Sequence, residues 1–145
     1  MTETVANIVI VEDDRNYAEP AMEALKAAIP GAMVRHIERE HDFRAALPEF
    51  AITPPDLIVM DMGFPYCMPG PTMPEAPDEV REEGGNFAGL RCQRLLAADL
   101  ATENVTVLFW SNTNTTALDE KRLRSDKFER TYFLDGRVSD RVPRL

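Results

Sequence analysis

Three short runs of apolar residues constrain the fold of this chain most strongly. They cover Asn7–Val11 (NIVIV), Leu57–Met60 (LIVM) and residues 105–110 (VTVLFW), and polar residues bound each run. β-branched and aromatic side chains, which favour strands, dominate all of them. Apolar residues follow one another here instead of alternating with polar ones, which is typical of strands covered on both faces. The sequence therefore predicts a sheet with helices packed on both of its sides.

Helical patterns and two weaker strands lie between and beyond these runs. The weaker strands are expected at Met33–Ile37 and 131–134, and the helices at 17–28, 41–47, 87–100 and 116–124. Pro20 fits only the first turn of a helix, so the first helix should begin near Asn16 or Tyr17, and Pro48 should stop the second. Strands and helices then alternate along the chain, which predicts an α/β fold with a doubly wound sheet of five parallel strands.

The composition narrows the class of protein. The chain has 145 residues, enough for one domain with a sizeable core, and its formal net charge is −9. An excess of acids disfavours nucleic acid as a partner, because binding to phosphates requires Lys and Arg. No segment approaches the roughly 20 apolar residues of a membrane span, and the N-terminus lacks the basic start of a signal peptide. Cys67 and Cys92 lie in no metal-ligand spacing, so we expect a cytoplasmic protein with reduced thiols and no membrane partner.

Residues 66–85 (YCMPGPTMPEAPDEVREEGG) do not fit the alternation of strands and helices. This stretch, called the 66–85 segment below, contains four prolines and five acids and directly follows the strand that ends before Asp61. We expect it to be an insertion within a single domain that spans residues 1–145, with a short helical turn beginning at Pro77. A solvated loop is the simpler interpretation, and a lid over Asp61 is the alternative.

Polar side chains follow the three main strands at the point where each one ends. Glu12 and Asp13 follow the first, Asp61 follows the second, and Ser111 follows the third. The carboxyl ends of parallel strands meet at one edge of a sheet, where open α/β folds bind ligands. We therefore expect Glu12, Asp13 and Asp61 to converge, although loop acids can also simply cap helices, as Asp14 could do.

Converging carboxylates repel one another unless a cation neutralises them. Oxygen ligands without nitrogen or sulfur favour Mg²⁺, which takes one or two carboxylates together with waters and phosphate oxygens. Such a site suits phosphoryl transfer, in which an aspartate acts as nucleophile. Asp61 is then the candidate nucleophile, and the Ser111 hydroxyl could contact the phosphoryl group, although Ser111 could equally be an ordinary turn residue.

Several motifs resemble the receiver domain of two-component response regulators. NIVIVEDD resembles the family's first strand with its acidic pair, PDLIVMDMGFP its third strand with the phosphoacceptor, and VLFWSNT its fourth strand with a switch hydroxyl. NFAGLRCQRLL is similar to the start of the family's third helix, with Gly89 in the usual place of a glycine. The resemblance covers residues 7 to about 136 and implies a flavodoxin-like (CheY-like) sheet.

The resemblance also implies a function and a set of site residues. Asp61 would accept a phosphoryl group from a histidine kinase or phosphotransfer protein, and a downstream protein would read the result. Mg²⁺ would be held by Glu12, Asp13, Asp61 and the backbone carbonyl of Gly63. Ser111 would move toward the phosphate, and the aromatic Tyr132 would follow it inward, although a place in the packed core is the simpler interpretation of Tyr132. The protein would be no enzyme beyond accepting its own phosphoryl group.

Two further features depart from the family's pattern. The fifth strand leads into Asp135 and Gly136, where the family has a lysine and a proline. An acid in the lysine's place would repel a phosphorylated aspartate. The chain given ends at Leu145, which leaves too few residues for a full fifth helix of about 12 residues. The sheet face left uncovered could then bind a partner or a second copy.

These departures keep a second function class open. A pseudo-receiver that is never phosphorylated could act as a constitutive protein-interaction or dimerisation module. A metal-dependent hydrolase with Asp61 as nucleophile is the weaker third hypothesis, because no second acid is placed as a general base.

Overall fold

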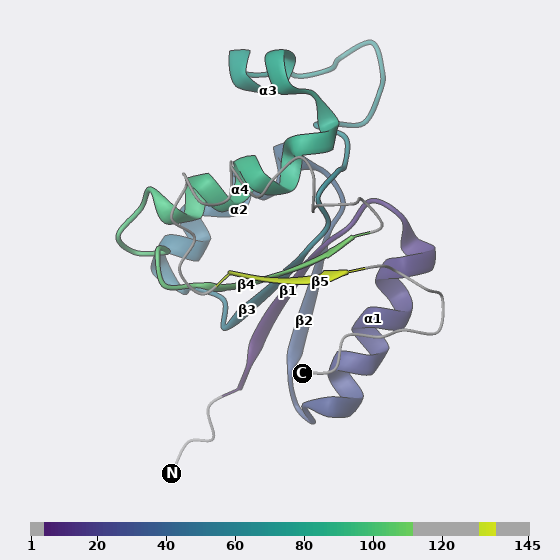
Figure 1. The fold of residues 1–145 in the computed structure, drawn as a ribbon, viewed down its shortest axis with the longest axis vertical. Helices are drawn as coiled ribbons and strands as arrows, with labels where there is room; N and C mark the ends of the chain where they lie inside the picture. Colours follow the sequence, from purple (N-terminus) through teal and green to yellow (C-terminus); the bar gives the residue numbers. More distant parts are fainter. Residues whose placement is uncertain (1–4, 112–130, 136–145) are drawn as a thin grey trace.

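The computed structural model describes residues 5–111 and 131–135, and its centre is a sheet of five parallel strands in the order β2-β1-β3-β4-β5. The strands are β1 (Asn7–Val11), β2 (Met33–Ile37), β3 (Leu57–Met60), β4 (Thr106–Ser111) and β5 (Thr131–Asp135). All four neighbouring pairs are parallel. The predicted α/β fold with a doubly wound five-stranded sheet is therefore confirmed (Figure 1).

Helices cover both faces of this sheet. Helix α1 (Arg15–Ala28) lies on one face, and α2 (Glu40–Ile52) and α4 (Ala88–Ala97) lie together on the other (Figure 1). The short helix α3 (Asp78–Glu83) and the 3-10 helix η1 (Gly85–Phe87) precede α4. None of the helices in the described ranges combines the length and the apolar character that crossing a membrane requires.

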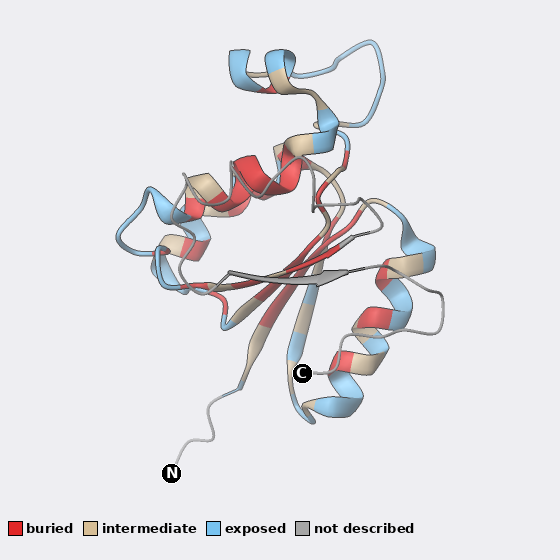
Figure 2. Cartoon of the chain, viewed as in Figure 1, coloured by how far each residue is buried: buried red, intermediate tan, exposed pale blue. Residues whose placement is uncertain are grey.

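The core has two parts, one on each side of the sheet. On the side of α2 and α4, Val11, Met60 and Phe109 pack with Phe43 and Leu90. On the side of α1, the alternate strand residues pack against the helix, namely Ile8, Ile10, Val59 and Trp110 with Ala18, Ala21 and Leu25. Figure 2 shows buried residues along α1 and α4, the helices on the two sides of the sheet. Both faces of the central strands are thus covered, which explains why their sequences are apolar without alternation.

The start of α1 corrects the prediction made from Pro20. The helix begins at Arg15, because Asp14 is its N-cap and accepts a hydrogen bond from the Asn16 amide at 2.9 Å. Pro20 therefore lies beyond the first turn. The alternative role considered for Asp14, a helix cap, is the one it has.

The prediction that Pro48 stops the second helix is wrong. Helix α2 continues through Pro48 to Ile52. A proline inside a helix removes one backbone hydrogen bond, but here the last turn carries Phe50, which is buried and packs edge-on against Phe43 at 5.7 Å between ring centroids. Burial of this aromatic side chain outweighs the lost hydrogen bond.

The remaining boundaries differ in smaller ways. Helix α4 is shorter than the predicted range 87–100, and Asn86 lies in η1 instead of capping α4, where Phe87 is the N-cap. The predicted helix at 116–124 and the expected absence of a full fifth helix after residue 136 fall outside the described residues.

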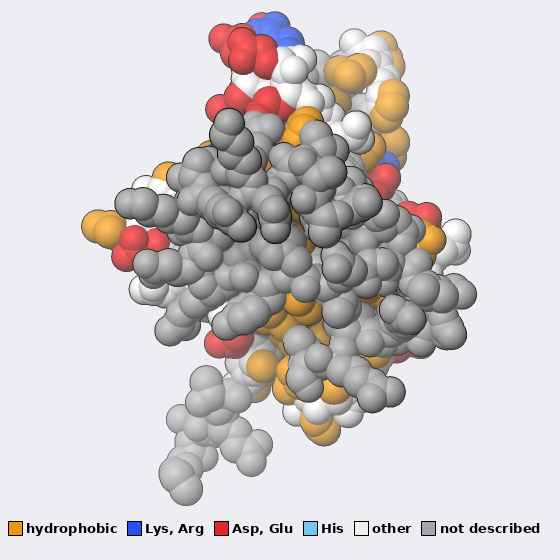
Figure 3. Space-filling model, in the orientation of Figure 1, with side chains coloured by type: hydrophobic (Ala, Val, Ile, Leu, Met, Phe, Trp, Pro, Cys, Tyr) orange, Lys and Arg blue, Asp and Glu red, His pale blue; other side chains and the backbone are white. Residues whose placement is uncertain are grey.

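The 66–85 segment projects beyond the carboxyl end of the sheet (Figure 1). The predicted helical turn after Pro77 is present as α3, whose Val80 is buried. Acidic side chains gather over α3 and apolar ones over the loop before it (Figure 3), where Met68 and Met73 are exposed. The segment is thus an attached extension of the fold with a partly apolar outer surface.

Candidate metal centre

Three carboxylates meet at the carboxyl end of the sheet. Glu12, Asp13 and Asp61 each offer an oxygen, and these oxygens all lie within 4.8 Å of one another. Strand pairing explains the placement, because the Asp61 amide donates to the Val11 carbonyl at 2.9 Å and so sets the end of β3 beside the end of β1. The expected convergence of these acids is therefore present, while their role as metal ligands stays a prediction.

Glu12 is the most deeply placed acid of this cluster, with only 3% of its surface exposed. Its Oε1 accepts the Asp14 amide at 3.0 Å, and its own amide donates to the Ile37 carbonyl at 2.9 Å. The His36 ring on β2 lies with Nε2 at 2.6 Å from the Glu12 carbonyl oxygen. Because a carbonyl can only accept, Nε2 carries the proton. His36 thus holds the backbone of Glu12 in place, a contact that the sequence did not predict.

Asp61 is half-buried and begins the loop that follows β3. Its Oδ1 accepts the amide of Met62 at 2.8 Å. Asp61 and Glu12 line one small crevice together with Tyr17 and Trp110. Hard oxygen donors at this spacing fit Mg²⁺, which accepts carboxylates together with waters. The donor set therefore agrees with the predicted metal.

The loop that follows Asp61 is held on two sides. On one side, the Phe64 amide donates to the Gly85 carbonyl at 3.2 Å and the Gly89 amide to the Met62 carbonyl at 2.9 Å. On the other side, the amides of residues 40 and 41 donate to the Pro65 carbonyl at 3.0 Å and the Tyr66 carbonyl at 2.7 Å. The Gly63 carbonyl, the fourth predicted ligand, belongs to this loop.

Gly89 has a steric reason for its place. A Cβ atom there would lie 2.2 Å from the Asp61 carbonyl oxygen, 3.0 Å from the Phe109 ring and 3.1 Å from the Met62 Cα. Only a residue without a side chain lets the start of α4 approach the end of β3 this closely. The glycine noted in the family resemblance therefore has a physical role next to Asp61.

A buried ionic network lies beside this loop and was not predicted. Glu40 is completely buried, and its carboxylate accepts hydrogen bonds from Arg91 at 2.6 and 3.0 Å and from Arg44 at 2.9 and 3.1 Å. Arg44 also reaches Glu79 at 2.7 Å. Burial alone would lower the pKa of the Arg44 guanidinium, but its hydrogen bonds to Glu79 and Glu40 raise the pKa above its usual value. The network joins α2, α3 and α4.

Ser111, Tyr132 and Asp135 are placed by backbone register alone. Ser111 pairs with Asp135 at the carboxyl ends of β4 and β5, and Tyr132 pairs with Leu108 further back. Ser111 and Asp135 therefore end their strands at the same edge as the three carboxylates. The side chains of all three predicted residues lie outside the described part of the structure.

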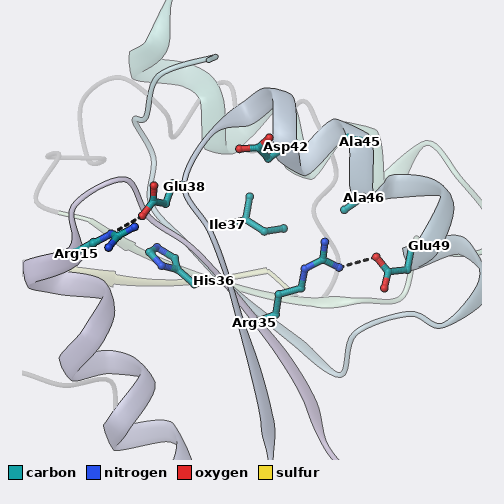
Figure 4. A pocket seen from close by; sticks show the side chains of 9 residues that line it. All are labelled: Arg15, Arg35, His36, Ile37, Glu38, Asp42, Ala45, Ala46 and Glu49. Carbon is teal, nitrogen blue, oxygen red and sulfur yellow. Dashed lines mark hydrogen bonds and ion pairs between the residues drawn. The ribbon is translucent and has the colours of Figure 1, made fainter. Parts of the chain in front are cut away.

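A pocket of about 570 Å³ lies along β2, the edge strand, and is lined by residues of α1, β2 and α2 (Figure 4). Two ion pairs cross it, Arg15–Glu38 at 2.8 Å and Arg35–Glu49 at 2.6 Å. The hydrogen bond from Arg15 holds the pKa of the Glu38 carboxyl below its usual value. These charges shield an edge strand from pairing with other chains, which gives the pocket a sufficient structural explanation.

The cysteines are free thiols in different surroundings. Cys92 is fully buried in α4, and burial raises its pKa well above the usual value. Cys67 is half-buried in the 66–85 segment. Within the described ranges, the acidic cluster is the only group of three or more His, Cys, Asp or Glu side chains with metal-binding spacing.

Several solved structures that superpose on this chain are response regulators. The phosphorylated cyanobacterial phytochrome response regulator RcpA superposes with a TM-score of 0.63 at 19% identity, over 90% of this chain and 80% of that one. The Mn²⁺-bound response regulator Rcp1 gives 0.62 at 15% identity, with the same coverage of 90% and 80%. A CheY-like receiver domain from Methylobacillus flagellatus gives 0.57 at 18% identity, over 93% of this chain and 89% of that one.

The sequence itself matches no family model and no curated protein. The structural similarity extends over most of both chains in each comparison, and the strand order 2-1-3-4-5 is that of flavodoxin-like folds. The chain therefore has the receiver fold of response regulators.

Proposed function

We propose that this protein is a signalling receiver that accepts a phosphoryl group on Asp61 with Mg²⁺ bound beside it. One observation carries the proposal: Glu12, Asp13 and Asp61 bring carboxylate oxygens within 4.8 Å of one another at the carboxyl end of the sheet. Among structures with the same fold, one is a phosphorylated response regulator and another is Mn²⁺-bound. Both support a divalent metal and a phosphoryl group as the ligands of this edge.

Different residues would bind the metal ion, accept the phosphoryl group and orient the accepting carboxylate. Glu12, Asp13, Asp61 and the carbonyl of Gly63 would hold the metal ion. When bound, Mg²⁺ supplies the positive charge that screens these carboxylates and the incoming phosphoryl oxygens. Asp61 attacks the phosphorus of a phosphohistidine, so that a phosphorus–oxygen bond forms, the phosphorus–nitrogen bond breaks and the imidazole leaves. The Met62 amide, which donates to Asp61, keeps the carboxylate oriented.

Ser111, Tyr132 and Asp135 would act after phosphorylation. The Ser111 hydroxyl would donate to a phosphoryl oxygen, and Tyr132 would follow it toward the core. Asp135 pairs in register with Ser111, so an acid stands where the resemblance predicts a lysine. An acid there would repel the phosphoryl group, so the phosphorylated state should depend on bound Mg²⁺ more strongly than a lysine-containing site would.

Residues 1–145 would form one receiver-like domain with the 66–85 segment inserted, in the cytoplasm. A histidine kinase or phosphotransfer protein would supply the phosphoryl group, and a downstream protein partner or a second copy of the chain would respond. Its only reaction would be its own phosphorylation. Neither nucleic acid nor a membrane is proposed as a partner.

The alternative is a pseudo-receiver that binds its partner without being phosphorylated. The register position of Asp135 beside Ser111 favours it, because this acid opposes a negative charge on Asp61. The two functions differ in two measurable respects, namely whether Asp61 is phosphorylated and whether partner binding depends on Asp61.

The test treats the protein with a small-molecule phosphodonor and measures its intact mass. With Mg²⁺, wild type should gain the mass of one phosphoryl group, and hydroxylamine should remove it; Asp61→Asn and wild type in EDTA should gain none. A wild type that gains no phosphoryl group under these conditions rejects the proposal. Partner or self-association that is unchanged in Asp61→Asn then supports the pseudo-receiver instead.

A further inference from the structure

The Glu40–Arg91 ion pair occupies an unusual position for charged side chains. The side chain of Glu40 is 0% exposed and that of Arg91 is 2% exposed. Arg91 donates from Nε to Glu40 Oε2 at 3.0 Å and from Nη2 to Oε1 at 2.6 Å. Burying two charges is unfavourable unless their geometry is good, and this fork-to-carboxylate arrangement is the favourable one. Such a pair fixes the relative position of the two helices that carry it.

Each partner of the pair also fixes one side of the loop that follows Asp61. Glu40 is the first residue of α2, and its amide donates to the Pro65 carbonyl at 3.0 Å. Arg91 donates from Nη1 to the Gly84 carbonyl at 2.7 Å, next to Gly85, whose carbonyl accepts the amide of Phe64. The loop thus lies between two backbone segments that one ion pair ties together.

We propose that Arg91 and Glu40 are positioning residues for the loop of residues 61–66. They keep the Asp61 carboxylate and the Gly63 carbonyl at the acidic cluster without touching a bound ion themselves. The metal-binding consequence rests on the function proposed above, whereas the ordering of the loop does not.

Arg44 provides a matched comparison. It binds the same Glu40 carboxylate, through Nε and Nη2, but its other partner is Glu79 on α3. Its second contact therefore leads away from the loop, whereas the second contact of Arg91, to the Gly84 carbonyl, leads to it. Lysine keeps the charge of either arginine but cannot reproduce its planar fork of donors. Arg91→Lys and Arg44→Lys thus remove the same chemistry from the two ends of one network.

The first experiment measures amide hydrogen exchange without metal. In Arg91→Lys, the amides of Phe64 and Glu40 should lose protection by about tenfold or more, while the sheet amide of Glu12 stays as in wild type. Arg44→Lys should leave the Phe64 and Glu40 amides within about twofold of wild type. If both variants keep wild-type protection at these two amides, or if both variants lose protection equally, the proposal is overturned.

A second variant separates positioning from stability. Glu40→Met combined with Arg91→Met replaces the pair by apolar side chains, an exchange that buried ion pairs often tolerate without loss of stability. The double variant should stay folded, as judged by circular dichroism. If the pair positions the loop, the folded double variant should still lose protection at the Phe64 amide. Wild-type protection at Phe64 in the folded double variant would show that packing alone orders the loop and would overturn the proposal.

The last measurement is Mg²⁺ affinity by calorimetry. Arg91→Lys should weaken binding by about 10- to 100-fold, the usual effect of losing a residue that orients metal ligands, whereas Arg44→Lys should not. Unchanged affinity in Arg91→Lys contradicts the positioning role at the metal. A wild type that binds no Mg²⁺ instead rejects the proposed function, and the hydrogen exchange result still decides whether the pair orders the loop.

Discussion

Replacing Gly89 with alanine would test how closely α4 must approach the edge of the sheet that carries Asp61. The substitution adds one methyl group near the start of the helix. That carbon would lie 2.2 Å from the Asp61 carbonyl oxygen and 3.1 Å from the Met62 Cα. Both contacts are to backbone, so no side-chain rotation can relieve them. Either the start of α4 or the end of β3 must move.

The size of the effect follows from these distances. Carbon–oxygen contacts in proteins lie at roughly 3.3 Å or more, so the overlap with the Asp61 carbonyl demands a movement of about 1 Å. Overpacking of this kind costs about 1–3 kcal/mol. Alanine favours helix over glycine by up to about 1 kcal/mol in a helix interior, and less at the second residue of a helix such as α4. The free energy of unfolding should therefore fall by about 1–3 kcal/mol.

Urea denaturation of Gly89→Ala and of a control, Gly70→Ala, measures this difference. At Gly70 an added Cβ meets nothing within 4 Å, so the control should unfold like wild type. Mg²⁺ affinity should also fall in Gly89→Ala, because the movement displaces the backbone of Asp61. If both alanine variants are as stable as wild type, the close approach of α4 to β3 is not required, and the reasoning about this edge is refuted.

Three further predictions concern the buried thiol and the acidic cluster. An alkylating reagent should modify Cys67 in the native protein and should leave Cys92 intact until the chain unfolds, because Cys92 is 0% exposed and has a raised pKa. Peptide mass spectrometry measures the modified sites. Modification of Cys92 in the native protein would contradict the prediction. Because the folded Cys92 thiol has the raised pKa, its contribution to the free energy of unfolding is complete below pH of about 8.5 and declines as the pH rises, so Cys92→Ala should lose less stability than wild type between pH 8 and 10. Asp13→Asn removes one of three mutually repelling carboxylates and should stabilise the metal-free protein by about 1 kcal/mol, but reduce the stabilisation gained from Mg²⁺. Denaturation in EDTA and in Mg²⁺ checks both signs, and a less stable Asp13→Asn in EDTA would argue against repulsion within the cluster.

The sheet was predictable from the sequence because its strands report their surroundings directly. An apolar run such as Leu57–Met60 needs cover on both faces, and alternation with helices leaves few arrangements besides a parallel sheet. The helix boundaries were less predictable. Proline signals pointed to a late start for α1 and an early end for α2, but the cap at Asp14 and the buried ring of Phe50 outweighed them. Local propensity competes with tertiary contacts that the sequence does not display.

The candidate site was likewise predictable only in part. The convergence of Asp61 with Glu12 was predictable, because strand order and parallel direction place the ends of β1 and β3 together. The Glu40–Arg91 pair was not predictable, because its partners are 51 positions apart and an arginine in a helical pattern is normally expected to face solvent. Arg91 lies among buried neighbours in α4, and only the folded chain shows which acid it meets.

Glu40 and Glu12, two buried acids in the described part of the chain, have different charged neighbours, and the difference predicts where the proposed Mg²⁺ would act. Glu40 is fully buried, and two guanidinium groups already neutralise it. Glu12, at 3% exposure, lies in the acidic cluster, where its carboxylate and those of Asp13 and Asp61 bring oxygens within 4.8 Å of one another. A divalent cation lowers the free energy of Glu12 and its neighbours but has nothing to add at Glu40, where it would compete with arginine. Stabilisation of the folded chain by Mg²⁺ should therefore depend on the acids at the sheet edge and should not change when Arg44 is replaced.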